Sequence, residues 1–352
     1  ASGCLWSGCC PAHGSGCILP CGVIQSFNIL SLSGYGNEIS IGGVEEGVPL
    51  GLNRGRSIMV DILVVYKKNF EAVHDESLNQ ISSVLDEISQ QRGLRVDIRA
   101  RERVRRADFI GRDLVIVLGG DGTLTSISHN IDANTPVMGV NSHPRDDDED
   151  GSFGFYMDSS IHTFAEDIQS ALDGKAIVND LPRLQAIIDT TSGNRFTTDP
   201  AMNDLLIANT HQYAPSRYHL RRGEDKLVQH SSGLIFSTWL GKGAWLSHAA
   251  NEQEYNQISD SIESDETDSH YFMLARDIPH SQRKASPWAS LAWTSETTTL
   301  TSDMHRGMIV PDGWDEVHFN RGATITVNLE APRIRLLTFR QSMIQRLNSY
   351  QS

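Results

Sequence analysis

Hydrophobic positions in the first part of the chain form short continuous runs. Val60 to Tyr66 is apolar except for Asp61, and Leu114 to Leu118 is wholly apolar and rich in β-branched residues. Such runs are typical of strands buried on both faces of a parallel sheet. Pro136 to Val140 predicts a further strand of the same kind.

Helical periodicity separates and follows these runs. Apolar residues recur at the spacing of one helix face from Ile81 to Ile88 and again from Ile161 to Leu172, and each segment is followed by a glycine, Gly93 and Gly174. Alternation of strands and helices predicts an α/β layer. We therefore expect an N-terminal α/β domain with a mostly parallel sheet over residues 57–160.

The pattern changes to short strands from about residue 175. Only one convincing helix is predicted there, from Trp245 to Ile258. This pattern predicts a β-rich, β-sandwich-like C-terminal domain over residues 161–340, and residues 341–352 form a tail that we expect to pack back on the α/β domain. The predicted strands are Leu184 to Asp189, Met202 to Ala208, Gly233 to Thr238, Leu291 to Leu300, Thr324 to Leu329 and Arg333 to Phe339.

Residues 1–56 differ from the rest in composition. All 5 cysteines of the 352-residue chain lie there, at Cys4, Cys9, Cys10, Cys17 and Cys21, and no strand or helix period persists. A disulfide framework is therefore excluded for the remainder of the chain. We predict a disordered, low-complexity leader, with the globular part beginning near Met59.

The charge balance limits the class of partner. Lys and Arg total 30 against 44 Asp and Glu, a net charge of −14. Nucleic acid and anionic membrane surfaces are therefore not expected as partners, because both require a concentrated basic face. The chain also has no run of about 18 apolar residues that could span a membrane. We expect a soluble protein, cytoplasmic in a prokaryote and mitochondrial or otherwise organellar in a eukaryote.

A glycine-rich turn carries the candidate chemistry. The sequence G-G-D-G-T, from Gly119 to Thr123, follows a predicted buried strand and opens a helix. Glycines permit positive φ and close approach of a ligand, and free N–H groups at a helix start favour a phosphate. The carboxylate of Asp121 would repel a phosphate, so it is better suited as a general base toward a hydroxyl or as a Mg²⁺ contact. The alternative is a plain glycine turn in which Asp121 caps the helix.

This turn resembles the G-G-D-G-T loop of the NAD kinases and of the diacylglycerol, sphingosine and 6-phosphofructokinases. Four further blocks resemble the NAD kinases in the same order: G-V-N at 139–141, M-N-D-L-L-I-A at 202–208, S-S-G-L-I-F-S-T through G-K-G-A-W at 231–245, and V-P-D-G at 310–313. Ser232 and Trp245 stand where the family usually has Asp and Tyr. These departures resemble the organellar NAD kinase and plant NADH kinase branch.

The resemblance implies transfer of the ATP γ-phosphoryl group to the adenosine-ribose 2′-hydroxyl of NAD⁺ or NADH. It implies that Asp121 is the catalytic base and that Gly119, Gly120, Gly122 and Thr123 bind the ATP phosphates. The implied NAD-binding residues are Asn141, Asn203, Asp204, Thr238, Ala244 and Trp245. No direct metal-ligand pattern is present, so Mg²⁺ would be held through the ATP phosphates, with Asp121 as an alternative contact. The family's usual assembly implies a homodimer.

Two other functions remain open from the sequence. A lipid kinase of the same superfamily shares the glycine turn, although the chain lacks the G-T-x-N-D block of those enzymes. A dinucleotide sensor without catalysis is suggested by the degenerate turn from Leu240 to Gly243. His143 and His248 fall within the matched blocks and are therefore candidates for contact with a substrate.

Overall fold

The computed structural model of the protein describes residues 59–68, 72–145 and 150–349. The predicted leader, residues 1–56, lies outside the described residues. Within the described part of the chain, no helix is both long and apolar enough to cross a membrane.

The first sheet has the strand order β2-β1-β3-β4-β19-β6, with the short β5 paired to β4. All neighbours run parallel except β6, which is antiparallel to β19. This confirms the predicted α/β fold with a mostly parallel sheet. The strands are β1 (Val60–Tyr66), β2 (Leu94–Ala100), β3 (Leu114–Gly119), β4 (Pro136–Asn141), β5 (Ser159–Ser160), β6 (Ile177–Leu181) and β19 (Ile334–Thr338).

Alternate side chains of this sheet pack on helices at its two faces. Ile62 and Val64 of β1 belong to the cluster with α1 and α4, whereas Leu63 and Val65 belong to the cluster with α2, α3 and α8. Burial on both faces explains why the central strands are almost continuously apolar. The helices are α1 (Ala72–Gln91), α2 (Arg106–Phe109), α3 (Asp121–Ser128), α4 (Phe164–Leu172) and α8 (Met343–Ser349).

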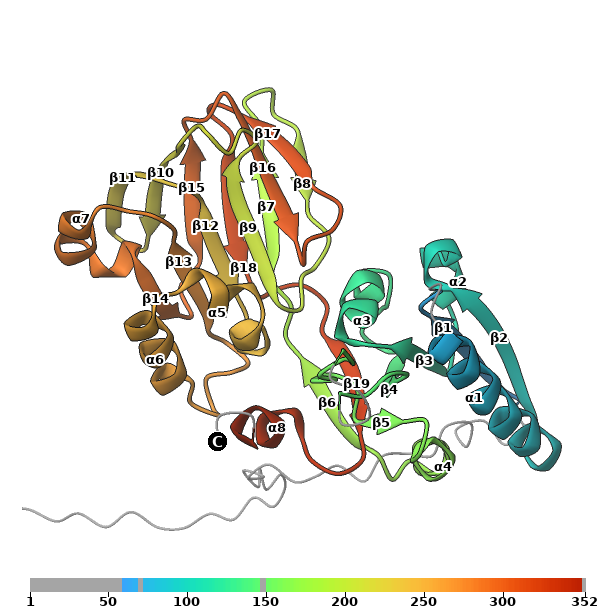
Figure 1. Ribbon diagram of the computed structural model, residues 1–352. Coiled ribbons are helices and arrows are strands. Elements are labelled where there is room, and N and C mark those ends of the chain that lie inside the picture. The colour runs from blue at the N-terminus through green and yellow to red at the C-terminus, as the bar shows by residue number, and fades with distance from the viewer. Residues whose placement is uncertain (1–58, 69–71, 146–149, 350–352) are drawn as a thin grey trace, which may run out of the picture. The chain divides into compact units, whose positions relative to one another are not determined.

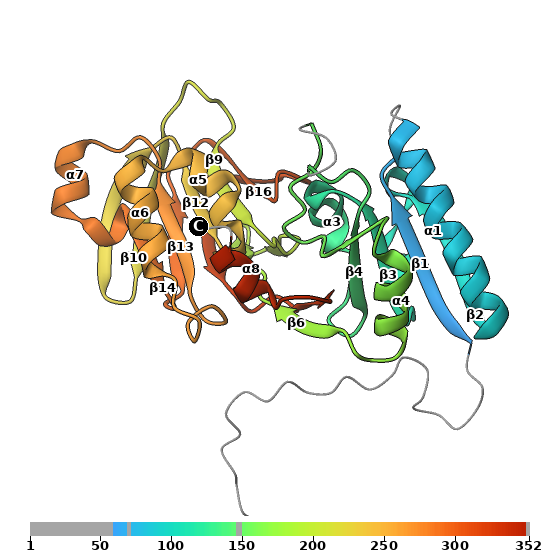
Figure 2. The same ribbon diagram turned by 60° about the horizontal axis from the view of Figure 1, so that its bottom comes forward.

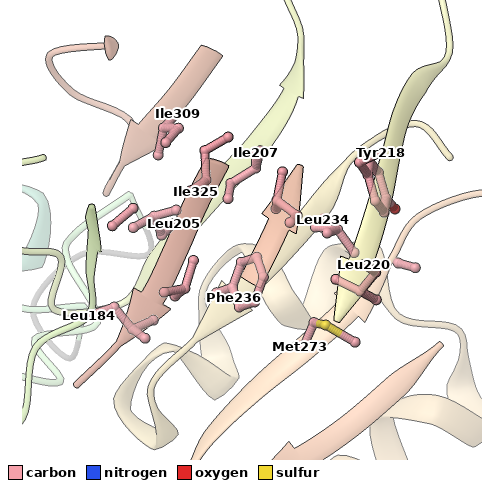
Figure 3. Packing of buried hydrophobic residues seen from close by; sticks show 14 of the residues in the cluster. Leu184, Leu205, Ile207, Tyr218, Leu220, Leu234, Phe236, Met273, Ile309 and Ile325 are labelled. Atoms are coloured by element: carbon pink, nitrogen blue, oxygen red, sulfur yellow. The ribbon is translucent and has the colours of Figure 1, made fainter. Parts of the chain in front are cut away.

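The β-rich part consists of two six-stranded antiparallel sheets. Its strands gather in the upper part of Figure 1. The facing side chains of the two sheets form one core, in which Leu205, Phe236 and Met273 meet Leu220 and Ile325 (Figure 3). This confirms the prediction of a β-rich C-terminal part. One sheet has the order β11-β10-β15-β18-β7-β8 and the other β14-β13-β12-β9-β16-β17. The strands are β7 (Gln185–Asp189), β8 (Arg195–Thr197), β9 (Asp204–Asn209), β10 (Ser216–Arg222), β11 (Asp225–Ser231), β12 (Leu234–Ser237), β13 (Tyr271–Ala275), β14 (Leu291–Thr294), β15 (Thr298–Ser302), β16 (Arg306–Pro311), β17 (Val317–Asn320) and β18 (Thr324–Asn328).

Helices cover the outer face of the second of these sheets. Leu246 of α5 (Trp245–Ala249) and Ile258 of α6 (Glu252–Ser261) pack against Ile235 and Phe272. The predicted single helix from Trp245 to Ile258 is therefore wrong. It is broken because Asn251 begins α6 as an N-cap, accepting a hydrogen bond from the Glu254 N–H at 3.0 Å. A short helix, α7 (His280–Ala285), follows β13.

The C-terminal strand belongs to the first sheet. Residues 333–339 were assigned to the β-rich domain by their pattern, but β19 pairs with β4 and β6. The chain crosses between the two parts at residues 182–184 and returns at residues 329–333. The boundary predicted at residues 160 and 161 differs from this arrangement, because α4 and β6 also belong to the α/β layer. Local hydrophobicity cannot reveal which sheet a buried strand joins.

The C-terminal helix lies beside β6 and β19 in both views (Figures 1 and 2). Met343 and Leu347 share a cluster with Leu63 and Val115 of the parallel sheet. The backbone N–H of Met343 donates to Oδ1 of Asn179 in β6 at 2.9 Å. The segment after residue 340 is thus anchored on the α/β layer by apolar burial and by this hydrogen bond.

One predicted strand is in fact two. Residues 291–300 were expected to form a single strand, but Leu291–Thr294 and Thr298–Ser302 belong to different sheets. A turn separates them, in which the N–H of Glu296 donates to Oγ1 of Thr294 at 3.1 Å. Serine and threonine hydroxyls commonly stabilise such turns, and the threonine-rich sequence conceals the break.

Candidate functional site

The G-G-D-G-T turn connects β3 to α3. Gly119 is the last residue of β3, and Gly120 is the N-cap of α3 with φ −107°. A Cβ atom at Gly119 would lie 2.3 Å from Oγ1 of Thr123, and one at Gly120 would lie 2.4 Å from Oγ of Ser152. Close packing therefore requires these glycines. The freedom of glycine to adopt positive φ is not used here, since neither they nor Gly122 is in that region.

A cleft of about 390 Å³ lies at this turn. The start of α3 contributes four of its lining residues, Gly120 to Thr123, so backbone N–H groups and the positive end of a helix dipole meet there. Lys67 and Arg101 add cationic side chains to the same cleft, which suits it to a polyanion. Trp314 also lines it, with the guanidinium carbon of Arg101 5.8 Å from the ring centroid.

Asp121 is half-buried, and both of its carboxylate oxygens are engaged. Oδ2 accepts from the Phe155 N–H at 2.9 Å, and Oδ1 accepts from the Tyr156 N–H at 2.8 Å. Burial raises the pKa of Asp121, and these two bonds act in the opposite direction. The carboxylate therefore holds the 155–156 backbone against the glycine turn, and it also borders the cleft.

Asn141 and His143 also line this cleft. The Asn141 amide donates to the Ser152 carbonyl at 3.1 Å and accepts from the His143 N–H at 3.1 Å. Asn141 thus shapes the cleft by tying its loop together. His248, by contrast, is an exposed residue of α5 and is not part of the cleft lining. Of the two candidate histidines, the structure brings only His143 to the cleft.

The Asn203-Asp204 turn precedes β9 and is held by side chains from distant strands. Asp312 accepts hydrogen bonds from the N–H groups of Met202, Asn203 and Asp204 at 2.7, 2.8 and 3.0 Å. The Asn203 carbonyl accepts from Oγ of Ser237 at 3.1 Å and from the N–H of Thr238 at 3.0 Å. The backbone of this turn is therefore fully bonded, and only the side chain of Asn203 is left to rotate.

The neighbouring Asp204 is a buried carboxylate, 4% exposed. Oδ2 accepts from the Trp245 N–H at 3.1 Å, whereas Oδ1 is buried without a hydrogen-bond partner among the described residues. Burial, together with the nearby carboxylate of Asp312, raises the pKa of Asp204 to about 7. An acid with a pKa near neutrality and an unbonded oxygen is suited to accept a hydrogen bond from a ligand hydroxyl.

The remaining predicted dinucleotide residues lie at the end of β12. Thr238 is fully buried and donates its hydroxyl to the Met202 carbonyl, so it supports the Asn203 turn. Ala244 links the 3₁₀ turn at Trp239–Gly243 to α5. Trp245 begins α5, is 36% exposed and lies under the guanidinium of Arg276. Trp245 is thus the residue of this group that presents an accessible aromatic surface.

Several residues of the site carried no local signal in the sequence. Tyr156 is 2% exposed, and its hydroxyl donates to Oδ1 of Asn203. Arg183 is 1% exposed and donates to the carbonyls of Ser128 at 2.8 Å and Pro332 at 2.5 Å, so it joins the end of α3 to the returning chain. Asp312 had a signal, because the V-P-D-G block contains it.

One other group of side chains could hold a cation. Ligand atoms of His129, Asp199 and Asp315 lie within 4.8 Å of one another among the described residues. Exposed carboxylates near a histidine are also common as solvated surface groups. We assign no ion to this group.

Comparison with known proteins finds similarity to NAD kinases. Residues 57–176 match the model of the ATP-NAD kinase N-terminal domain. A probable NADH kinase of Oryza sativa subsp. japonica is 26% identical over 291 residues, covering 75% of this chain and 81% of the relative. An NAD kinase of Thermoplasma volcanium is 23% identical over 238 residues, covering 68% of this chain and 78% of the relative.

Solved structures show the same fold. An NAD kinase from Archaeoglobus fulgidus in complex with ATP gives a TM-score of 0.60 at 15% identity, covering 82% of this chain and 99% of that chain. Yeast NADH kinase complexed with NADH gives a TM-score of 0.63 at 14% identity, covering 83% of this chain and 88% of that chain. The domain match, the relatives and the ordered sequence blocks agree with one another, and each shows similarity of this chain to the NAD kinases.

Proposed function

We propose that the protein transfers the γ-phosphoryl group of ATP to the 2′-hydroxyl of the adenosine ribose of NAD⁺ or NADH. The products are ADP and NADP⁺ or NADPH. The observation that carries the proposal is the carboxylate of Asp121 at the first turn of a helix whose N-terminus opens into a cleft that Lys67 and Arg101 also line. The relatives named NAD kinase and NADH kinase support the same activity.

The cleft at α3 is the proposed donor site. The N–H groups of Gly120, Asp121 and Gly122 bind phosphate oxygens, and Lys67 and Arg101 neutralise their charge. The Thr123 N–H donates to the Gly120 carbonyl at 2.8 Å, so Thr123 contributes by holding the turn in shape. Gly119 contributes by allowing the close packing of Thr123. Trp314, 42% exposed at the edge of this cleft, offers a surface on which the adenine can stack.

The Asn203-Asp204 turn is the proposed acceptor site. Asn203 donates to, and Asp204 accepts from, vicinal ribose hydroxyls. Trp245 and Ala244 line the dinucleotide, whereas Thr238 acts through its support of the turn. Asn141 ties its loop together with one N–H and one lone pair of its amide, and its second N–H remains for a hydrogen bond to NAD.

Asp121 is the proposed base. Each carboxylate oxygen accepts one backbone N–H and keeps a second lone pair for the 2′-hydroxyl. The proton passes from the 2′-oxygen to Asp121 as the oxygen–phosphorus bond forms and the γ-phosphorus–oxygen bond to ADP breaks. The raised pKa of Asp121 favours this transfer, since a base whose pKa is closer to the operating pH accepts a proton more readily.

The residues of this site fit a Mg²⁺ ion that is bound mainly by the substrate ATP. Among the described residues, the carboxylates lining the cleft are those of Asp121 and Asp150, and Asp121 already accepts two N–H groups. We therefore propose that Mg²⁺ is held mainly by the ATP phosphates, where it neutralises charge. From the family resemblance we also propose a homodimer, located in the cytoplasm of a prokaryote or in an organelle of a eukaryote.

Replacing Asp121 by asparagine tests the base. The amide keeps one acceptor but cannot take the proton, so kcat with ATP and NAD⁺ or NADH should fall by about 10²-fold or more. Asp86→Asn, at an exposed position on α1, is the matched control and should keep wild-type kinetics. Near-normal turnover of a folded Asp121→Asn protein would exclude Asp121 as the base.

A further inference from the structure

Tyr156 joins the two halves of the proposed site. Its backbone N–H donates to Oδ1 of Asp121 at 2.8 Å, and its side-chain hydroxyl donates to Oδ1 of Asn203. Asp121 and Asn203 are separated by 82 positions in sequence and come from the α/β layer and the β-rich part, respectively. One buried residue therefore bonds both the proposed base and the acceptor-site amide.

The phenol fixes which end of the Asn203 amide faces Tyr156. An asparagine amide has an oxygen that accepts and an NH₂ group that donates. If the amide turned over, the NH₂ group could donate to the phenol oxygen, but the buried phenol hydrogen would lose its acceptor. Tyr156 is 2% exposed, so water cannot readily replace that acceptor. The orientation with Oδ1 toward Tyr156 is therefore strongly preferred.

This orientation determines what Asn203 offers to a ligand. Its Nδ2 group has no hydrogen-bond acceptor among the residues that the structure describes, and Asn203 is only half-buried. The backbone is already held by Asp312, Ser237 and Thr238. Only the side chain of Asn203 could still rotate, and its hydrogen bond with the Tyr156 hydroxyl prevents this rotation. Asn203 then presents two N–H donors to an oxygen of the bound molecule.

We propose that Tyr156 is a positioning residue that orients the Asn203 amide as a hydrogen-bond donor to the dinucleotide and links it to the Asp121 turn. The inference rests on the proposed function, because it assigns the dinucleotide to the Asn203 side of the site. Tyr156 itself touches neither reacting atom. Its effect on the reaction passes through Asn203.

Tyr156→Phe removes the hydroxyl and keeps the buried ring. We expect kcat/KM for NAD⁺ and NADH to fall about tenfold, the equivalent of one hydrogen bond to a buried group. The KM for ATP should change less than about twofold, because the donor cleft keeps its lining. Tyr218→Phe is the matched control, since Tyr218 is equally buried but its hydroxyl bonds Gln229 and Ser231 in the sandwich core. Equal losses toward ATP and dinucleotide in Tyr156→Phe would contradict the proposal.

A double-mutant cycle with Asn203→Ala separates positioning from general support of the fold. If Tyr156 acts through Asn203, Tyr156→Phe should have little further effect on dinucleotide kcat/KM in the Asn203→Ala background. The same fold-loss in both backgrounds would overturn the inference. Asn203→Asp provides a second route that leaves Tyr156 unchanged: it keeps an acceptor for the phenol but removes the donors. Wild-type kinetics in Asn203→Asp would overturn the donor assignment.

Calorimetric binding of NAD⁺ and NADH distinguishes failure of this inference from failure of the proposed function. If the wild-type protein binds dinucleotide without turnover, and Tyr156→Phe weakens that binding, the kinase activity is excluded while the positioning role stands. Equal binding by wild type and Tyr156→Phe contradicts the positioning role. Absence of dinucleotide binding to the wild-type protein excludes both.

Discussion

Replacing Asp312 by asparagine should destabilise the protein through the Asn203-Asp204 turn. Asp312 is held with φ 47°, and its carboxylate accepts three backbone N–H groups of this turn. Oδ2 takes the Met202 N–H at 2.7 Å, and Oδ1 takes those of Asn203 and Asp204 at 2.8 and 3.0 Å. An asparagine has one oxygen, so its NH₂ group must face at least one N–H donor.

The magnitude follows from that mismatch. A buried donor left without its partner costs about 1–3 kcal/mol, and bonds to a charged acceptor are roughly twice as strong as neutral ones. Removal of the charge offsets part of the loss, because burial raises the pKa of Asp312 to about 6 and so penalises its ionised form. We therefore expect a net loss of about 1–3 kcal/mol, or roughly 2–5 °C in Tm for a protein of this size.

Thermal unfolding at pH 8 measures this effect. Asp225→Asn is the matched control: Asp225 is an exposed residue of β11, and its replacement should change stability by less than about 0.5 kcal/mol. The Asp312→Asn protein should also bind NAD⁺ more weakly, since the turn that carries Asn203 loses its anchor. A Tm equal to that of the Asp225→Asn protein, with unchanged NAD⁺ affinity, would refute the assigned role.

Three further predictions concern the fold, pH and the donor. Arg183→Met should lower Tm by more than Asp312→Asn, because it removes at once the guanidinium hydrogen bonds to the carbonyls of Ser128, Ile131 and Pro332; an unchanged Tm would contradict this. The pKa of Asp204 in the folded protein is raised to about 7, so its contribution to stability is full below about pH 4 and is lost as pH rises through 7. The Tm of the wild-type protein should therefore fall more between pH 5 and 8 than the Tm of Asp204→Asn. Parallel pH profiles would exclude that titration. Trp314→Ala should weaken ATP binding by roughly fivefold or more while leaving inorganic tripolyphosphate binding unchanged, and equal losses for both ligands would exclude base stacking.

The central strands of the parallel sheet could be predicted from sequence because burial on both faces requires a continuous run of apolar residues. Leu114 to Gly119 is fully buried, and its continuous apolar run predicted a strand. The edge strand β2 was not predicted. Its alternate residues Arg95, Asp97 and Arg99 are charged, and they are exposed to solvent or form ion pairs. Hydrophobicity therefore does not distinguish this strand from a loop.

The candidate site could be predicted only where the turn and its functional side chain lie in one continuous segment of the sequence. The Asp121 turn is such a segment, since glycines, carboxylate and helix start are contiguous. The hydrogen bonds of Tyr156 to Asn203 and of Asp312 to Met202 join residues 47 and 110 positions apart. Such pairings depend on the tertiary fold, and a single sequence contains no local pattern for them.

The most direct measurement is product analysis with ATP and Mg²⁺ supplied together with either NAD⁺ or NADH. The proposed function predicts ADP and a dinucleotide that has gained one phosphate and serves an NADP(H)-specific dehydrogenase, which locates the phosphate on the adenosine ribose 2′-oxygen. A sphingoid base and diacylglycerol, supplied as alternative acceptors, should remain unphosphorylated. Phosphorylation of either lipid without formation of NADP⁺ or NADPH would contradict the assignment, as would tight dinucleotide binding with no phosphorylated product.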